Sequence, residues 1–185
     1  RRGRFVELCQ KQQIDAVGLA GIDGRLVEGE RNRGIRVREG GKTLIKRDLS
    51  GKPRRANERL LRLLLDNGYR PVLSIPIVDT DGFAINSEND DIVNVLQTAL
   101  RADKILQLIE AAGFLEDRNE PNTLVPRMSQ EELARREEQV EGRMKRKMLA
   151  LRKLFQAGAA EVIISDGRTE HPVNDALAGK GTTIT

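Results

Sequence analysis

The chain has 185 residues, of which 38% are hydrophobic and 32% are charged, while aromatic residues contribute only 3%. This composition excludes an intrinsically disordered chain and indicates a soluble globular protein with an aliphatic core, and no apolar run is long enough for a membrane span. The net charge of +4 is by itself weak evidence for nucleic-acid binding. The single cysteine, Cys9, excludes an internal disulfide, so we expect a cytoplasmic protein.

The first half of the chain predicts helices and strands in alternation, interrupted by one basic hairpin. In chain order, we expect a helix over residues 4–12, a strand over 15–20, a turn over 21–24, hairpin strands over 35–38 and 43–45, a helix over 57–67, a strand over 71–76, a polar loop over 79–91 and a helix from about 92. Ile35 and Val37 alternate with Arg36 and Arg38, which is the period of a half-solvated strand, and Gly40-Gly41 is a common hairpin turn.

The second half continues the same alternation. We expect a strand over residues 104–109, a loop over 117–126, a helix from 129, a helix over 143–156, and a strand over 161–165 that ends at a turn. Ser129 and Glu132 have the spacing of a capping box at the start of the first of these helices. Together the elements predict an α/β fold with a largely parallel central sheet, in which the basic hairpin is an insertion.

The sequence lacks the residues of most familiar catalytic sites. It has one histidine and one cysteine, far apart, so neither a zinc cluster nor a Cys-His pair is indicated. It also has no Gly-x-Ser-x-Gly, no Walker loop and no Gly-x-Gly-x-x-Gly. A reaction that needs little acid–base catalysis therefore fits best, and phosphoryl transfer is one, because positioning and charge neutralisation do most of the work.

A polar cluster over residues 86–91, Asn-Ser-Glu-Asn-Asp-Asp, stands where a helix is predicted to begin. On its own it is typical of a capped helix whose acidic residues favour the helix dipole. The same residues are candidates for binding a polar ligand, and both interpretations stay open at this point.

A basic segment over residues 142–147 opens the helix predicted over 143–156. Its charges fit an ordinary solvated helix face. At about 100° per residue, one apolar stripe is predicted to contain Met144, Met148, Leu151 and Phe155. Lys147 falls within the arc of this stripe, whereas Lys145 and Arg146 point elsewhere. Burying an unpaired ammonium is costly, so Lys147 needs a partner, and an anionic ligand such as phosphate would serve.

Taken in chain order, these motifs resemble those of the amino acid kinase family. The motifs are Val17–Gly24, Pro71-Val-Leu, Ile85-Asn86 followed by Asp90, Met144 followed by Lys147, and Gly179-Lys-Gly-Thr182. The last of them, like Ser165-Asp-Gly-Arg168, would otherwise pass for an ordinary turn. Each motif is weak alone, but the colinear set is specific and spans nearly the whole chain.

Within the family the chain resembles N-acetylglutamate kinases. It is closer still to kinases of 2-aminoadipate or glutamate tethered to a small acidic amino-group carrier protein, as the basic hairpin and the segments 47–53 and 142–147 suggest. The resemblance implies ATP- and Mg²⁺-dependent phosphorylation of the side-chain carboxylate of an N-blocked acidic amino acid, giving an acyl phosphate in lysine or arginine biosynthesis. No metal ligated by the protein's own side chains is implied.

The resemblance also implies an architecture, a three-layer αβα sandwich in a homodimer or higher homo-oligomer. Residues 1–102 would be the remainder of an N-terminal amino-acid-binding lobe, and residues 103–185 a C-terminal nucleotide-binding lobe. The family's opening strand, with a catalytic lysine, and its Gly-rich loops have no counterpart here. We therefore expect them to precede Arg1, and this chain alone to be incomplete as an enzyme.

The resemblance assigns roles to individual residues. Asn86 would bind the α-amino and carboxylate region of the substrate, Asp90 would orient catalytic lysines, and Lys147 would stabilise the transferring phosphoryl group. The nucleotide side would comprise Leu108, Ile109, Glu110, Gly113 and Gly142. The family usually has Ser/Thr-Asp where this chain has Ile109-Glu110, and Asp-Gly or Gly-Gly where it has Glu141-Gly142.

The basic hairpin admits several functions. Between residues 31 and 47, seven basic residues stand against the single acid Glu39. Arg33, Arg36 and Arg38 are predicted to dock the acidic carrier protein, or else the charges only deter edge-to-edge strand pairing. A nucleic-acid-binding module is disfavoured, because no aromatic residue interleaves the basic ones. A non-catalytic regulatory relative is a further alternative, because Ile109-Glu110 departs from the family's usual Ser/Thr-Asp. Neither a nucleic-acid nor a membrane partner is expected.

Overall fold

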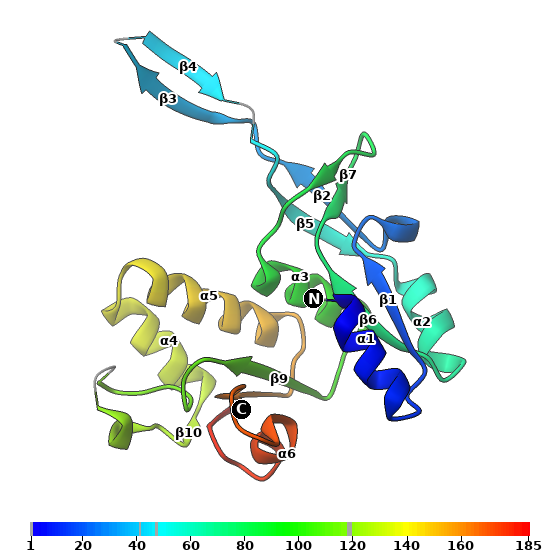
Figure 1. Ribbon diagram of the computed structural model, residues 1–185. Helices are drawn as coiled ribbons and strands as arrows, with labels where there is room; N and C mark the ends of the chain where they lie inside the picture. Colours follow the sequence, from blue (N-terminus) through cyan, green and yellow to red (C-terminus); the bar gives the residue numbers. More distant parts are fainter. Residues whose placement is uncertain (1, 41, 47, 118–119) are drawn as a thin grey trace. The chain divides into compact units, whose positions relative to one another are not determined.

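The computed structural model describes residues 2–40, 42–46, 48–117 and 120–185 (Figure 1). The chain forms two compact units, Arg1–Leu100 and Arg101–Thr185, and each is described here by itself. Gly41, predicted in the hairpin turn, and Arg47, which follows the hairpin, lie outside the described residues. None of the helices in the described part is both long and apolar enough to cross a membrane.

The described residues of the first unit form three α-helices, one 3-10 helix and eight strands. The helices are α1 (Arg2–Lys11), η1 (Asp23–Arg25), α2 (Glu58–Asp66) and α3 (Asn89–Leu100). The strands are β1 (Ala16–Ala20), β2 (Val27–Arg31), β3 (Ile35–Glu39), β4 (Lys42–Lys46), β5 (Gly51–Ala56), β6 (Arg70–Ser74), β7 (Ile77–Asp79) and β8 (Ala84–Ile85). They pair as β1 with β6, as the sheet β5-β2-β7-β8, and as the hairpin β3–β4.

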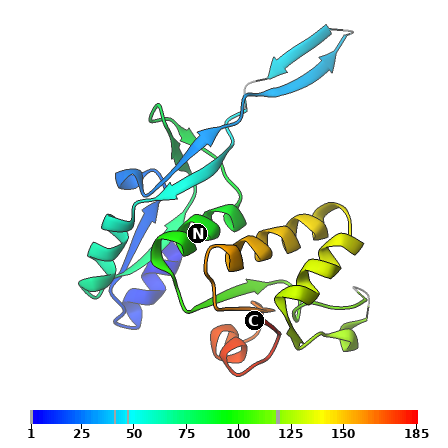
Figure 2. The same ribbon diagram turned by 180° about the vertical axis from the view of Figure 1, so that it is seen from behind.

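The parallel pair β1–β6 lies between helices (Figure 2). Side chains alternate along a strand, so Gly18 and Leu19 face opposite sides of β1. Gly18 faces α1, because a Cβ there would lie 3.1 Å from the Cγ2 of Val6. Leu19 packs on the other side against a buried cluster that includes Leu26 and, from α2, Leu61. This part of the unit therefore has a helix–sheet–helix arrangement.

The sheet β5-β2-β7-β8 shares that buried cluster with α3. Ile77 of β7 and Ile85 of β8 pack in it together with Ile92 of α3. β5 is an edge strand and contains Pro53, which lacks a main-chain N–H and is tolerated at a sheet edge. β8 leads directly from this sheet to the start of α3, so the packing fixes the position of the residues between them.

The basic hairpin consists of β3 and β4 in antiparallel pairing. Arg36 lies opposite Ile45 and Arg38 opposite Thr43, so residues 36 and 38 occupy the same face of the hairpin. Arg33 and Arg38 are exposed, whereas the Arg36 side chain lies outside what the structure describes. That the hairpin is an insertion stays a prediction.

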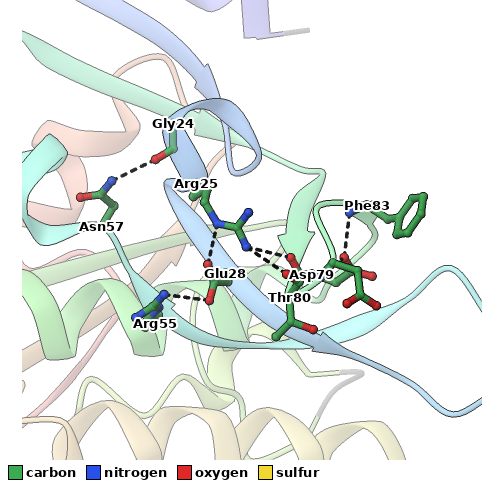
Figure 3. Close-up of polar contacts among 9 residues, drawn as sticks. Gly24, Arg25, Glu28, Arg55, Asn57, Asp79, Thr80 and Phe83 are labelled. Carbon is green, nitrogen blue, oxygen red and sulfur yellow. Dashed lines mark hydrogen bonds and ion pairs between the residues drawn. The ribbon is translucent and has the colours of Figure 1, made fainter.

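A polar network fastens the turn between β7 and β8 to β2 (Figure 3). The Asp79 side chain is buried, and its carboxylate accepts the main-chain N–H of Phe83 at 2.7 Å. The Arg25 guanidinium donates from Nη2 to the Asp79 carbonyl at 3.2 Å and from Nε to the Glu28 carboxylate at 2.8 Å. The bond from Arg25 holds the pKa of Glu28 below its usual range. The network thus ties together three segments that are distant in sequence.

The second unit has one four-stranded sheet and helices on it. The helices are η2 (Pro121–Thr123), α4 (Gln130–Gln139), α5 (Gly142–Gln156) and α6 (Pro172–Leu177), and the strands are β9 (Lys104–Ile109), β10 (Arg127–Met128), β11 (Glu161–Asp166) and β12 (Thr182–Ile184). The strand order is β10-β12-β11-β9, in which β9 is parallel to β11 and β12 is antiparallel to it. α6 packs against β9 and β11 and buries Ala176.

The predicted α/β class is confirmed, with a parallel strand pair in each unit. The sequence-based prediction was wrong over the loop expected at residues 79–91, which contains β8, and it assigned no helix or strand to several other segments. β5, β7, β8, β12 and α6 were not predicted as elements. All are short, and the strands among them exist because a partner strand from elsewhere in the chain pairs with them, which local periodicity does not reveal.

Replacing Asn57 with alanine should lower the free energy of unfolding by about 1–2 kcal/mol, as losing an N-cap does. Asn57 Oδ1 accepts the Leu60 N–H at 3.1 Å and its Nδ2 donates to the Gly24 carbonyl at 2.9 Å (Figure 3). Urea unfolding followed by circular dichroism measures the loss. Asn57→Ser retains a capping oxygen and should restore most of it. Equal losses in both variants would assign the effect to the Gly24 contact instead.

Candidate functional site

The second unit contains a cavity of about 300 Å³, at the lower end of the size range of small-molecule sites. Its walls come from the end of β9, the segment 111–115, α5 and β11. The lining residues are Ile109, Ala111, Gly113, Phe114, Leu115, Met144, Lys147, Met148, Leu151 and Ile164. Of these described residues Lys147 alone carries a charge. The cavity therefore suits a ligand with an apolar part and an anionic part.

Lys147 lies on the side of α5 that faces this cavity. It is half-buried, whereas the neighbouring Lys145 and Arg146 are exposed, so the helix phase inferred from the sequence holds for these three residues. Within the described part of the chain, Lys147 has no ion-pair partner. An ammonium group that is partly withdrawn from water and unpaired favours an anionic ligand.

The apolar stripe of α5 differs from the prediction at both ends. Met144 is 42% exposed rather than buried, because it stands in the first turn of α5, where it borders the cavity. The buried residues are Met148, Leu151 and Leu154, while Phe155 is only half-buried. The core-facing side of the helix is thus rotated slightly towards Leu154.

The wall formed by segment 111–115 is fixed by one buried hydroxyl. Thr182 is fully buried, and its Oγ1 donates to the Val125 carbonyl at 2.7 Å and accepts the Phe114 N–H at 2.8 Å. Gly113 has φ 153°, and a Cβ on it would meet Thr182 Oγ1 at 2.8 Å. A glycine is therefore needed where this segment passes β12.

The predicted nucleotide residues are only partly brought together. Ile109 and Gly113 line the cavity, whereas Leu108 and Glu110 are exposed and are absent from its described lining. Gly142 is the first residue of α5 and is also exposed. Sequence reasoning missed Phe114 and Thr182, although Thr182 belongs to a motif that it had singled out. A threonine that ends a Gly-x-Gly turn was the available signal.

The other two candidates lie in the first unit, near the start of α3. The side chains of Asn86 and Asp90 are both exposed there. Asn86 donates its main-chain N–H to the Leu49 carbonyl at 2.7 Å and accepts the Gly51 N–H at 2.8 Å. Ser87 beside it is buried, and its hydroxyl has no hydrogen-bond partner among the described residues. Asn86 and Asp90 are thus brought to one place, while Lys147 belongs to the other unit.

Electrostatics at the carboxyl end of β11 is dominated by one ion pair. Arg168 donates to Asp166 from Nε at 2.9 Å and from Nη2 at 2.7 Å. The Arg168 side chain lowers the pKa of Asp166 to about 2, so this carboxylate stays ionised at any physiological pH. Asp166 is occupied by Arg168 and is not a candidate base.

The profile of the amino acid kinase family matches residues 3–166, a stretch that includes Asn86, Asp90 and Lys147. The chain belongs to the amino acid kinase family. The family predicted from the sequence motifs is therefore confirmed.

Among curated relatives, the LysW-aminoadipate kinase of Thermus thermophilus is 36% identical over 98% of this chain and 68% of its own length. The corresponding enzyme of Deinococcus radiodurans is 35% identical over 97% of this chain and 62% of its own length. The acetylglutamate kinase of Methanopyrus kandleri is 32% identical over 98% of this chain and 70% of its own length. The chain thus spans about two thirds of the length of these relatives.

A solved structure supports the fold of this family member. The N-acetylglutamate synthase of Neisseria gonorrhoeae, complexed with coenzyme A and N-acetylglutamate, matches with a TM-score of 0.79 at 20% identity. The match covers 100% of this chain and 41% of that chain. At this identity the likeness concerns the fold alone.

Thr182→Val should destabilise the second unit by about 1–3 kcal/mol, because it leaves the Phe114 N–H and the Val125 carbonyl without their buried partner. Valine has nearly the same shape, so packing changes little. Thr183→Val on the same strand is the matched control, since Thr183 bonds to Pro126 only through its main chain. Urea unfolding of both variants measures the difference, and equal losses would contradict the role of the Thr182 hydroxyl.

Proposed function

We propose that the protein is an ATP-dependent kinase of the side-chain carboxylate of an N-blocked acidic amino acid, most closely carrier-linked 2-aminoadipate or glutamate. The observation that carries the proposal is Lys147, the one charged side chain among the described residues that line the cavity of the second unit. Two LysW-aminoadipate kinases are more than a third identical over nearly the whole chain, which supports this substrate class.

The chemistry explains why this site needs a cation rather than a base. A glutamate-like carboxylate has a pKa of about 4.3 and is already ionised at pH 7. One carboxylate oxygen forms a bond to the γ-phosphorus, the bond from that phosphorus to the ADP oxygen breaks, and no proton is transferred. The barrier is repulsion between two anions, which lysine ammonium groups and Mg²⁺ reduce.

In this proposal each of the two units binds a different reactant. The first unit, as the remainder of an amino-acid-binding lobe, binds the substrate near Asn86, with Asp90 orienting the catalytic lysines. The second unit holds ATP, with its apolar part against Ile109 and Phe114 and its phosphates towards Lys147. Mg²⁺ arrives with the phosphates, as it usually does in phosphoryl transfer.

N-acetylglutamate kinase is the second candidate. It performs the same reaction on a small molecule, and the Methanopyrus kandleri enzyme is similar over nearly the whole chain. The basic hairpin favours the carrier-linked substrate instead, because an acidic carrier would be attracted to a cluster of arginines and lysines. The exposed side chains of Arg33 and Arg38 are available for such docking.

In the full-length enzyme, Lys147→Ala should lower kcat by about 10²–10³-fold with little change in the KM for the amino acid, because the ammonium is needed where phosphoryl charge develops. Lys145→Ala, two residues away and exposed, is the matched control and should retain activity. A coupled assay of ADP release measures both. Similar losses in the two variants would contradict the role of Lys147.

Replacing Arg33, Arg36 and Arg38 together with serine should sharply reduce activity on the carrier-linked substrate and leave activity on the N-acetylated small molecule unchanged. The wild-type preference for the carrier should also weaken as salt is raised. The control replaces Lys11, Arg59 and Lys153, three exposed basic residues outside the hairpin, with serine. Loss of both activities would make the hairpin structural, and loss of neither would favour free N-acetylglutamate as the substrate.

A further inference from the structure

A compact cluster of hydrogen-bonded polar residues, Asn32, Asp48 and Ser50, closes the base of the basic hairpin. We call it the polar cluster. The Asp48 carboxylate accepts the Ser50 main-chain N–H at 3.0 Å on Oδ1 and the Ser50 hydroxyl at 2.6 Å on Oδ2. Asn32 Nδ2 donates to Ser50 Oγ at 2.7 Å, and the Asn32 N–H donates to the Ser50 carbonyl at 2.9 Å. These bonds hold the two chain segments at the base of the hairpin together.

The charge of Asp48 is stabilised in this arrangement. The hydrogen bond from the Ser50 hydroxyl, first among several donors, lowers the pKa of Asp48. Arg31 also donates from Nε to the Asp48 carbonyl at 3.0 Å. Asp48 therefore acts as a hydrogen-bond acceptor at neutral pH, and none of the roles assigned above to other residues uses it.

Two main-chain hydrogen bonds join the segment that carries the polar cluster to Asn86. The Asn86 N–H donates to the Leu49 carbonyl at 2.7 Å, and the Gly51 N–H donates to the Asn86 carbonyl at 2.8 Å, so Asn86 forms a parallel bridge with Ser50. Leu49 and Gly51 are the residues on either side of Ser50, which Asp48 holds. Gly51 leaves little room for adjustment, because a Cβ on it would collide with the Glu30 carbonyl.

We propose that Asp48 is a positioning residue for Asn86, acting through the fixed backbone of residues 49–51, and so determines how well the acidic amino-acid substrate is held. The inference rests on the proposed function, because it takes Asn86 to be the substrate contact. Both main-chain groups of Asn86 bond to the segment 49–51, which Asp48 holds in place, so displacement of this segment displaces Asn86. The same polar cluster closes the basic hairpin. Substrate binding and the geometry of the hairpin therefore both depend on one set of hydrogen bonds.

A double-mutant cycle in the full-length enzyme tests this proposal. Asp48→Ala should raise the KM for the amino-acid substrate about tenfold, the order expected for losing hydrogen bonds to a charged group, and leave the KM for ATP unchanged. In an Asn86→Ala background, Asp48→Ala should add little, because its effect passes through Asn86. Effects that multiply in the double variant would overturn the proposal.

Conservative and control variants separate positioning from general destabilisation. Asp48→Asn keeps one acceptor oxygen and should restore most of the lost affinity. Ser50→Ala, which removes the hydroxyl from the centre of the polar cluster, should reproduce the rise in KM. This variant takes the place of Asp48→Ala if Asp48→Ala does not fold. Glu30→Ala on β2 removes a nearby carboxylate paired with Arg54 and should leave the KM unchanged. An equal rise for Glu30→Ala would overturn the proposal.

The proposed function fails in a different way. If the wild-type enzyme phosphorylates neither the carrier-linked nor the N-acetylated acidic amino acid, the substrate assignment is wrong whatever the variants do. If the wild type is active and Asp48→Ala leaves every kinetic constant unchanged, the assignment stands and the positioning role is wrong.

Discussion

The need to pair buried main-chain groups governs how both units hold their loops. Where chain segments leave a sheet and no strand is available, a side chain supplies the missing partner. Thr182 does this for the main-chain groups of Phe114 and Val125, Asp79 for the N–H of Phe83, and Asp48 for the N–H of Ser50. Thr182 fixes a segment that lines the cavity of the second unit, and Asp48 fixes a segment that is bonded to Asn86. Rigidity at those regions thus depends on a few hydroxyl and carboxylate oxygens rather than on the sheets alone.

The two parts of the proposed chemistry place different demands on their surroundings. Stabilising phosphoryl charge requires a cation that is partly withdrawn from water, and the half-buried position of Lys147 beside apolar side chains meets that demand. Recognising an amino acid requires polar groups held in a fixed orientation. Asn86 can keep its side chain free for this purpose, because its main-chain groups are already paired with residues 49 and 51.

The sequence predicted what local periodicity and motif order can encode. The α5 helix phase separated Lys147 from Lys145, and the colinear motifs identified the family before any contact was known. It did not predict β7, β8 or β12, because strands of two or three residues are too short to show a periodicity. It did not predict β5, because this strand contains a proline and three basic residues. The cavity was equally inaccessible from sequence. Phe114 and Met148 come to line it only when α5, β9, β11 and the segment 111–115 have packed, and the bonds of Thr182 span 57 and 68 residues.

The edge strand β5 has a consequence for the behaviour of the protein in concentrated solution. An uncovered strand edge is a template on which another molecule can add its own strand and begin to aggregate. Pro53 removes one donor from β5, and the exposed Lys52, Arg54 and Arg55 stand along it, with Arg54 paired to Glu30 and Arg55 to Glu28. An incoming strand would find a donor missing and would have to displace water from these long charged side chains. The part of β5 beyond the bridge between Ser50 and Asn86 is therefore a poor template for a strand from a second copy.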